Sequence, residues 1–167
     1  MTLRRLALAS LLAIASLPFA SSSDAAEPAR QPSLAVTTVD GKPFTLLEQR
    51  GKWVIVNFWA TWCAPCIAEM PDISAFVSSR HDVVAIGLAY EDTDKQEIVD
   101  FLARRPVAYA IAQLDVSDPP RDFATPRGLP TTYLIAPDGT IAKHFLGPIT
   151  EKDLAEAITA AKAAKKG

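Results

Sequence analysis

Apolar residues concentrate in two runs near the middle of the chain. The first run, residues 53–59, reads Trp-Val-Ile-Val-Asn-Phe-Trp, and the second covers residues 82–89. A strand that is covered on both faces loses the alternation of apolar and polar residues, so each run predicts a buried strand. A shorter stretch at residues 107–112 predicts a third strand. We therefore expect a sheet at the centre of the fold.

Two further pairs of segments predict β-hairpins. Residues 34–39 and 42–46 flank Asp40-Gly41, and residues 131–136 and 140–146 flank Pro137-Asp138-Gly139. Glycine after aspartate supplies the positive φ that tight turns between antiparallel strands need. One hairpin is thus expected at the start of the fold and one near its end. Residues 46–50 predict a single helical turn.

Helical spacing of apolar residues appears between the strands. Residues 64–79 predict a helix that Pro71 kinks, because proline lacks the backbone N–H that a helix uses. Asp94 and Glu97 have the spacing of a capping box, and apolar residues follow them at helical spacing. They predict a second helix, and the acidic residues 91–94 before it are expected to be solvated.

The end of the chain completes the order of elements. Residues 117–127 are polar and proline-rich, with one helical turn expected at residues 121–124. Thr150 and Asp153 open a final amphipathic helix that reaches about residue 165. Strands that alternate with helices and end in a hairpin and a helix predict an α/β fold. A central mixed β-sheet is expected between helices, with the first hairpin as an N-terminal extension.

The first 26 residues differ from the rest. Arg4 and Arg5 precede an apolar stretch at residues 6–20, and small residues follow it. This order is typical of a secretory signal peptide, and the apolar stretch is short for a membrane-spanning helix. An uncleaved membrane anchor is the alternative. A lipoprotein is excluded, because no cysteine lies near the end of the apolar stretch to take the lipid.

Length and composition limit the number of domains. The chain has 167 residues, of which 49% are hydrophobic, and this suits one domain with a substantial core. We assign residues 27–33 to a polar lead-in and residues 34–167 to the domain. The net charge is −2 and no basic stripe is visible, so nucleic acid is not expected as a partner. We expect a monomer.

The chain has two cysteines, Cys63 and Cys66, at the predicted start of a helix. A helix start favours a thiolate, because its backbone N–H groups are unpaired and its dipole is positive there. Two sulfurs at this spacing can bond to each other. The pair would be a poor structural staple, because a bridge over two intervening residues constrains the unfolded chain little. The pattern therefore indicates a pair that cycles between dithiol and disulfide, without a bound cofactor.

Two other uses of a Cys-x-x-Cys pair fit the sequence less well. A structural zinc site needs four ligands, but the two histidines, His81 and His144, lie far apart along the chain. Haem attachment needs a histidine directly after the second cysteine, and Ile67 stands there. No metal is therefore expected.

The residues around the cysteines resemble a known family. Residues 51–66, which read Gly-Lys-Trp-Val-Ile-Val-Asn-Phe-Trp-Ala-Thr-Trp-Cys-Ala-Pro-Cys, and the following Glu69-Met70-Pro71 are similar to the TlpA/ResA family. Its members are exported thioredoxin-like thiol–disulfide oxidoreductases. Residues 128–135 and Pro137-Asp138-Gly139 are similar to the second signature of the family. The resemblance covers about residues 34–160 and implies a thioredoxin-like fold and an exported, periplasmic protein.

This resemblance implies roles for individual residues. Cys63, as the more exposed sulfur, attacks the disulfide of a client protein, and the more buried Cys66 resolves the mixed disulfide. Pro130 follows a cis peptide bond in a loop that faces the cysteines, with an ordinary trans turn as the alternative. The loop presents the backbone of Leu129 to an extended client segment. Trp62 shapes the surface beside Cys63.

Glu69 is implied as the acidic residue near the active site. As a partly buried carboxylate it would have a raised pKa and would exchange a proton with Cys66. A solvated helix charge is the alternative. Asn57 stands where cytoplasmic thioredoxins carry a buried aspartate, and an amide cannot titrate. Glu69 is therefore the candidate proton acceptor.

The residues between the cysteines bear on the direction of the reaction. Pro65 removes a backbone donor near the sulfurs, and Ala64 adds no positive charge that would stabilise a thiolate. We expect a reductant of client disulfides, with an oxidase or isomerase as the alternative. The family implies clients such as apocytochrome c or copper-site proteins. It also implies a membrane thiol donor that reduces the spent pair.

Two rival functions from related folds fit less well. A copper-binding assembly factor usually spaces its cysteines by three residues and adds a distal histidine, for which His144 is the candidate. A peroxidase needs a lone cysteine in a Pro-x-x-x-Thr-x-x-Cys context, which the chain lacks.

Overall fold

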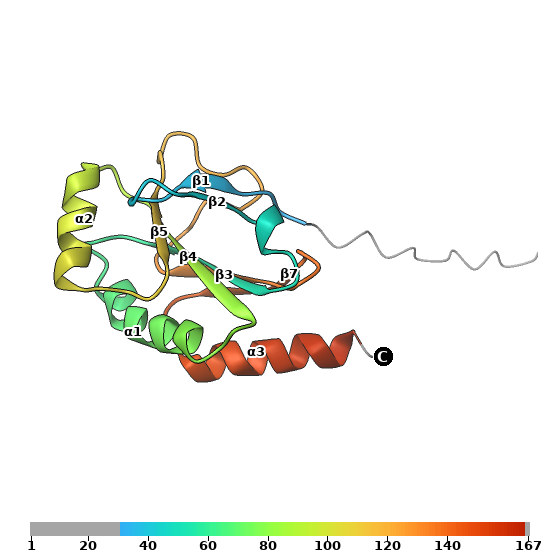
Figure 1. The fold of residues 1–167 in the computed structure, drawn as a ribbon. Helices are drawn as coiled ribbons and strands as arrows, with labels where there is room; N and C mark the ends of the chain where they lie inside the picture. The colour runs from blue at the N-terminus through green and yellow to red at the C-terminus, as the bar shows by residue number, and fades with distance from the viewer. Residues whose placement is uncertain (1–30, 166–167) are drawn as a thin grey trace, which may run out of the picture.

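The computed structural model describes residues 31–165, which form one central sheet with helices and a small hairpin around it (Figure 1). The elements are β1 (Ala35–Thr37), β2 (Pro43–Thr45), the short 3-10 helix η1 (Leu47–Gln49), β3 (Trp53–Trp59), α1 (Ala64–Ser78), β4 (Val83–Ala89), α2 (Lys95–Arg104), β5 (Ala110–Gln113), β6 (Thr131–Ile135), β7 (Ile141–Leu146) and α3 (Glu151–Ala164). Every main strand and helix that the apolar pattern predicts is present. The predicted signal peptide lies outside the described residues. Within residues 31–165, no helix is long and apolar enough to cross a membrane.

The central sheet has five strands in the order β5-β4-β3-β6-β7. β3 pairs in parallel with β4, and β4 pairs in parallel with β5. β6 pairs antiparallel with both β3 and β7, so the sheet is mixed, as predicted. All seven residues of the central strand β3 are buried, which explains why its run is apolar except for Asn57.

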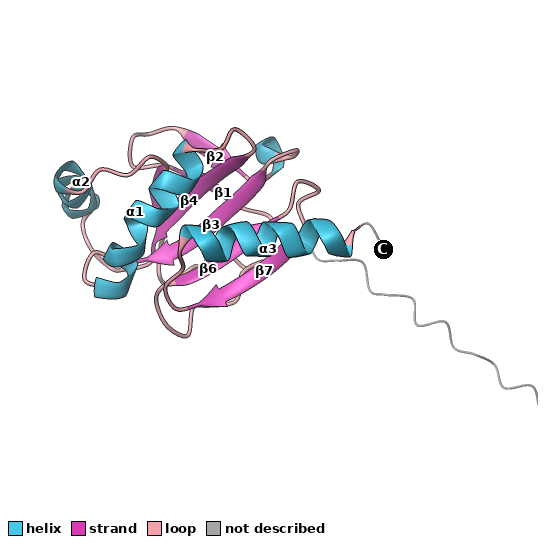
Figure 2. Ribbon diagram, turned by 90° about the horizontal axis from the view of Figure 1, so that it is seen from below, coloured by secondary structure: helices cyan, strands magenta, loops and turns pink. Residues whose placement is uncertain are grey.

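Helices α1 and α3 cover one face of the sheet, the hairpin covers the other, and α2 lies at the side of the sheet (Figure 1, Figure 2). On the helical face, Ile55 of β3 shares a buried cluster with Ile73 of α1 and Leu154 of α3. On the opposite face, Phe58 of β3 shares a cluster with Phe44 of the β1–β2 hairpin. The flanking helices and the N-terminal hairpin are confirmed, and the hairpin packs on the second face of the sheet.

Glycine fixes both hairpin turns. Gly41 and Gly139 have φ values of 84° and 83°, which residues with a side chain disfavour. At Gly139 a Cβ would also meet the guanidinium of Arg50, whose Nη1 donates to the carbonyl of Asp138. The two predicted Asp-Gly turns are confirmed, and the second one ties the sheet to the segment before β3.

The predicted capping box of α2 is wrong. Asp94 is the N-cap residue, but its side chain accepts no hydrogen bond from the backbone of the helix. The partner residue of the expected box, Glu97, instead accepts a hydrogen bond from Thr93 Oγ1. A residue outside the expected box therefore competes for the glutamate. The corresponding box of α3, between Thr150 and Asp153, is present with both of its hydrogen bonds.

Two predicted boundaries also differ. Residues 121–124 form a turn rather than a helical turn, and the Phe123 N–H donates to the Pro120 carbonyl at 3.1 Å. β5 begins three residues later than expected. The reason lies in α1, because Ser74 Oγ accepts the Ala108 N–H at 3.2 Å and takes this donor from the strand ladder.

Candidate active site

Cys63 and Cys66 lie at the N-terminus of α1, a few residues after β3. Cys63 is the N-cap residue, and its Sγ accepts a hydrogen bond from the Cys66 N–H at 3.3 Å. The sulfurs form a disulfide with an S–S distance of 2.04 Å, and the Cα atoms are 5.3 Å apart. The predicted position at a helix start is confirmed, and the structure shows the oxidised form of the pair.

The surroundings of the pair are apolar on the inside and open on the outside. Cys66 is fully buried and Cys63 is 4% exposed, so the predicted order holds although both residues are buried. Trp62 is 70% exposed beside Cys63, and Ala64 and Pro65 are exposed as well. A partner must approach from this side, because a buried apolar cluster encloses the rest of the pair.

The loop before β6 lies against the same apolar cluster. The Leu129–Pro130 peptide bond is cis, as predicted, so the trans alternative is wrong. Pro130 is buried, and its carbonyl accepts the Gly147 N–H at 2.9 Å. Leu129 is half-buried and packs against the cluster that contains both cysteines. Within residues 31–165, the backbone N–H and C=O of Leu129 have no hydrogen-bond partner, so they are open to an incoming segment.

Leu146 adds an exposed apolar side chain that sequence reasoning missed. It ends β7, pairs with Thr131 of β6 and is 68% exposed. Its Cδ1 lies 3.9 Å from the position that a Cβ of Gly128 would take, so it borders the cis-proline loop. A single leucine in an edge strand carries no functional signal in the sequence. Only its pairing with Thr131 places it at this loop.

Glu69 is buried inside the fold rather than solvated on α1. It is 3% exposed, and its Oε1 accepts from Asn57 Nδ2 at 2.7 Å. Its Oε2 accepts from the backbone N–H of Ile149 at 2.8 Å. Burial raises the pKa of Glu69 to about 7, although the hydrogen bonds from Ile149 and Asn57 oppose this rise. The alternative of a solvated charge is therefore wrong.

Asn57 connects Glu69 to the sheet. Its Nδ2 also donates to Thr132 Oγ1 at 2.9 Å, so α1, β3 and β6 meet in one buried polar contact. Three buried atoms have no partner within the described part of the chain: Asn57 Oδ1, Trp59 Nε1 and Tyr109 Oη. Burial raises the pKa of Tyr109, and the negative charge of Glu69 raises it further. The charge of the Glu69 carboxylate therefore also affects Tyr109, to which it has no hydrogen bond.

Glu91 is the second buried carboxylate among residues 31–165. The prediction of a solvated residue is wrong, since Glu91 is 7% exposed. Its Oε1 accepts the backbone N–H of Thr61 at 2.8 Å, and its Oε2 accepts Thr61 Oγ1 at 2.9 Å. The parallel strands β3 and β4 end at the same edge of the sheet, which brings the segments after them together. Because Glu91 begins an acidic segment, the sequence gives no indication of this contact.

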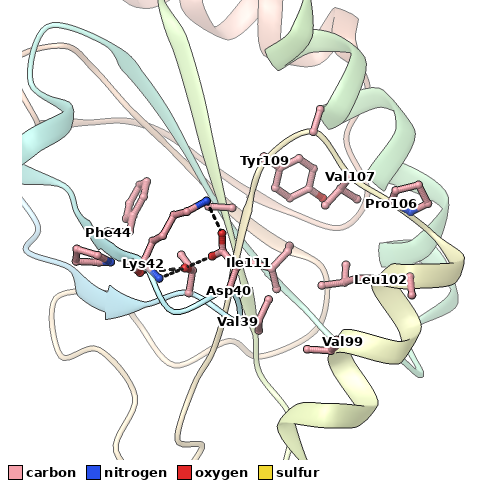
Figure 3. Close-up of a pocket in the computed structure, with 15 residues that line it drawn as sticks. Val39, Asp40, Lys42, Phe44, Val99, Leu102, Pro106, Val107, Tyr109 and Ile111 are labelled. Atoms are coloured by element: carbon pink, nitrogen blue, oxygen red, sulfur yellow. Dashed lines mark hydrogen bonds and ion pairs between the residues drawn. The ribbon is translucent and has the colours of Figure 1, made fainter.

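A groove of about 710 Å³ lies between the β1–β2 hairpin, α2 and β5 (Figure 3). Phe44 and Leu102 line it, and Asp40 and Lys42 form an ion pair at 2.7 Å within it. The groove contains neither cysteine. The cysteines lie beside exposed Trp62 instead, an arrangement that suits a protein substrate better than a small molecule. In the described part of the chain, no three His, Cys, Asp or Glu side chains are grouped so that they could hold a metal ion.

Comparison with known proteins agrees with this geometry. The AhpC/TSA family matches residues 28–144. The thiol-disulfide oxidoreductase ResA of Bacillus subtilis is 31% identical over 137 residues, which are 80% of this chain and 74% of ResA. A thioredoxin-family thiol:disulfide interchange protein from Chlorobium tepidum has a TM-score of 0.64 at 26% identity, covering 81% of this chain and 97% of that protein. A secreted disulfide oxidoreductase of Mycobacterium tuberculosis has the same fold, with a TM-score of 0.65 at 22% identity over 76% of this chain and 95% of that protein.

Fold, disulfide and relatives agree on one class of protein, the thioredoxin-fold thiol–disulfide oxidoreductases. The chain belongs to the AhpC/TSA family, in its TlpA/ResA-like branch. The resemblance noted in the sequence is thereby confirmed. Enzymes of this class exchange disulfides with other proteins, so proteins that contain disulfides are the substrates.

Proposed function

We propose that the protein reduces disulfides of client proteins outside the cytoplasm. The observation that carries this proposal is a Cys-x-x-Cys pair at a helix start whose intervening residues, Ala64 and Pro65, carry no charge. A pair becomes a strong oxidant when its reduced form is stabilised. Uncharged residues between the cysteines give the Cys63 thiolate no such stabilisation. The pair therefore favours the disulfide and donates electrons to its client.

The reaction consists of two thiol–disulfide exchanges. The Cys63 thiolate attacks one sulfur of the client disulfide, which forms a mixed disulfide and releases a client thiolate. The Cys66 thiolate then attacks Cys63 Sγ and releases the second client thiolate. Two electrons have passed to the client, and the protein holds the Cys63–Cys66 disulfide that the structure shows. Another dithiol must then reduce this disulfide, and we assign this step to a thiol donor in the membrane.

Glu69 is the proton acceptor for Cys66 in this proposal. Cys66 must lose its proton before it can attack the mixed disulfide, and it is fully buried. Glu69 follows it by about one turn on α1 and has a pKa raised to about 7 by burial. A base with a pKa near the working pH transfers protons in both directions. The amide of Asn57 holds the carboxylate in place through Oε1.

Client binding is assigned to the surface beside the pair. The free backbone groups of Leu129 would bind an extended client segment by strand addition, and the cis bond before Pro130 shapes this loop. Exposed Trp62 and Leu146 border the site, so they would contact apolar client side chains. This surface leaves the client cysteine next to Cys63.

Export is part of the proposal. The basic and apolar pattern of residues 1–26 supports a signal peptide or an anchor, and one relative of the same fold is a secreted disulfide oxidoreductase. Clients of the periplasm, such as apocytochrome c or copper-site proteins, then become candidates for reduction. A disulfide oxidase or isomerase remains the alternative, and the reduction potential separates it from a reductase.

A trapping experiment tests the assignment of the two cysteines. The reduced Cys66→Ser variant, mixed with a peptide that contains a disulfide, should accumulate a mixed disulfide through Cys63 because nothing resolves it. The reduced Cys63→Ser variant is the matched control and should trap far less peptide. Mass spectrometry of the adducts measures both. Equal trapping by the two variants would show that Cys63 is not the attacking residue.

A further inference from the structure

Glu91 holds the turn that carries the attacking cysteine. Both of its carboxylate oxygens bind Thr61, one through the backbone N–H at 2.8 Å and one through the side-chain hydroxyl at 2.9 Å. The residue before Glu91 is anchored to the same region, since the Tyr90 N–H donates to the Trp59 carbonyl at 2.8 Å. The segment after β4 therefore binds the end of β3 at Trp59 and the turn before Cys63 at Thr61.

The position of this carboxylate also matters electrostatically. Glu91 is 7% exposed, so water screens its charge poorly. Its oxygens bind Thr61, two residues before Cys63, and a thiolate on Cys63 would carry the same sign of charge. Like charges in a partly buried site disfavour the charged form of each other. The carboxylate therefore opposes the Cys63 thiolate.

Three other titratable or charged side chains lie around the pair. Glu69 lies on α1, neutral Tyr109 precedes β5 and packs against the cluster of the cysteines, and the Arg105 guanidinium after α2 lies 5.1 Å from the ring centre of Phe101 in that cluster. Of these, Glu69 adds to the negative charge when it is ionised. Glu91 is the one whose hydrogen bonds reach the turn that leads into Cys63.

We propose that Glu91 is a positioning residue that fixes the Thr61–Cys63 turn and, through its charge, shifts the Cys63–Cys66 pair toward the disulfide. This inference deepens the proposed reductase function and rests on it for its biological meaning. The hydrogen bonds set where Trp62 and Cys63 lie, directly before the first turn of α1. The charge makes the reduced pair a better electron donor. Thr61 partly neutralises this charge by donating two hydrogen bonds to it.

The test is the equilibrium of the protein with reduced and oxidised glutathione, which needs no client. Each turnover converts the dithiol and one oxidised glutathione into the disulfide and two reduced glutathiones, so the electrons balance. Glu91→Gln keeps the shape of the side chain and removes the charge. We expect its equilibrium to move toward the dithiol by threefold to about tenfold, where tenfold corresponds to about 30 mV. Asp92→Asn removes an exposed neighbouring charge and should stay within about twofold of wild type.

Thr61→Val gives a result of opposite sign. The valine keeps the backbone N–H but removes the hydroxyl donor, which leaves the Glu91 charge less neutralised. We expect its equilibrium to move toward the disulfide by about threefold, a shift that a purely structural role would not produce. The proposal is overturned if Glu91→Gln stays within twofold of wild type or if Asp92→Asn shifts the equilibrium equally. If Glu91→Gln does not fold, a Thr61→Val equilibrium that is unchanged or moves toward the dithiol overturns it.

Failure of the reductase function would look different. A protein that exchanges with glutathione as expected but does not reduce a client disulfide would contradict the proposed function alone. If the wild-type protein reduces clients normally but Glu91→Gln leaves the glutathione equilibrium unchanged, only the role of Glu91 is contradicted.

Discussion

At the scale of the residue, Glu69 shows how burial changes the chemistry of a common side chain. The same carboxylate on a solvated helix would stay ionised above its ordinary pKa of 4.5. Here it lies between α1 and the sheet, with Asn57 and the Ile149 N–H as its donors. These two hydrogen bonds make up for the loss of water only in part, so the pKa stays raised to about 7. The protein therefore holds a group that gains or loses a proton near neutral pH.

The raised pKa of Glu69 predicts a pH dependence of stability. Because the folded pKa of about 7 lies above the ordinary 4.5, the folded protein binds this proton more tightly than the unfolded chain. Stability from this group is fully present below pH 4.5 and falls as the pH rises toward 7, by up to about 3 kcal/mol. Denaturant unfolding of the oxidised protein between pH 4.5 and 8 measures the decline.

Glu69→Gln should remove this decline and still fold. Asn57 Oδ1 has no partner in the described residues, and a flipped Asn57 amide would accept the new glutamine N–H and the Thr132 hydroxyl. We expect a flat stability profile over the same pH range. A wild-type decline that persists in the variant would show that another group causes it.

The same variant tests the proton transfer. If Glu69 accepts the proton of Cys66, Glu69→Gln should slow the reduction of a disulfide peptide by about 10² or more near neutral pH. Glu48→Gln, at an exposed glutamate of η1, serves as the matched control and should react at the wild-type rate. Stopped-flow kinetics of the reduced proteins gives both rates. An unchanged rate in the folded Glu69→Gln variant would dispose of the proposal.

At the scale of the element, the active site is built from segment ends rather than from the middle of any strand or helix. Cys63 caps α1, Glu91 follows β4 and Pro130 precedes β6. The ends of the parallel strands β3 and β4 meet at one edge, and β6 begins at the same edge because it runs antiparallel to β3. The geometry of the site therefore depends on how the elements are held against one another.

The capping box of α3 is one such fixed end. Thr150 Oγ1 accepts the Asp153 N–H, and Asp153 Oδ2 accepts the Thr150 N–H at 2.8 Å. Thr150→Ala should lower the free energy of unfolding by about 1 kcal/mol, because it leaves the first turn of the helix without its cap. Thr159→Ala, within the same helix, should cost nothing or stabilise slightly, because alanine is the better helix former. An equal loss in both variants, measured by denaturant unfolding, would contradict the capping role.

Gly87 shows a packing limit in the middle of β4. A Cβ there would stand 2.5 Å from Ile111 Cδ1, 3.1 Å from Trp59 Nε1 and 3.2 Å from a ring carbon of Tyr109. Gly87→Ala should therefore lower the free energy of unfolding by about 1–3 kcal/mol. Gly128→Ala is the control, since its nearest neighbour would be 3.9 Å away. A Gly87→Ala variant as stable as Gly128→Ala in thermal unfolding would show that the pocket around Gly87 adapts freely.

At the scale of the whole molecule, a mixed sheet flanked by three helices and a hairpin holds one redox pair beside the exposed Trp62. The order of strands and helices follows from the apolar pattern, and β3 matches its predicted bounds because its seven-residue, nearly continuous apolar run has the length and the β-branched and aromatic content of a buried strand. The cysteine pair was likewise visible, since its spacing and its helix start are local features. Both belong to the part of the fold that neighbouring residues determine.

Contacts between distant segments were not visible in the sequence. Glu91 reads as part of an acidic, solvated stretch, and only the pairing of β3 with β4 brings it to Thr61. Leu146 reads as an ordinary strand residue until β6 places it beside the cis-proline loop. The predicted capping box at Asp94 was wrong for a similar reason, because a neighbouring residue, Thr93, donates its hydrogen bond to Glu97. The residues that sequence missed are those whose roles depend on tertiary neighbours.

The reduction potential of the Cys63–Cys66 pair tests the central claim most directly. The purified protein would be equilibrated in glutathione or dithiothreitol buffers, and the fraction of disulfide would be measured after thiol trapping. No positive charge stands between the cysteines, and two buried carboxylates, Glu69 and Glu91, follow them in the sequence, so we expect a potential below about −220 mV, on the thioredoxin side of the scale. A potential between about −120 and −180 mV, the range of strong oxidants and isomerases, would contradict the proposed reductase.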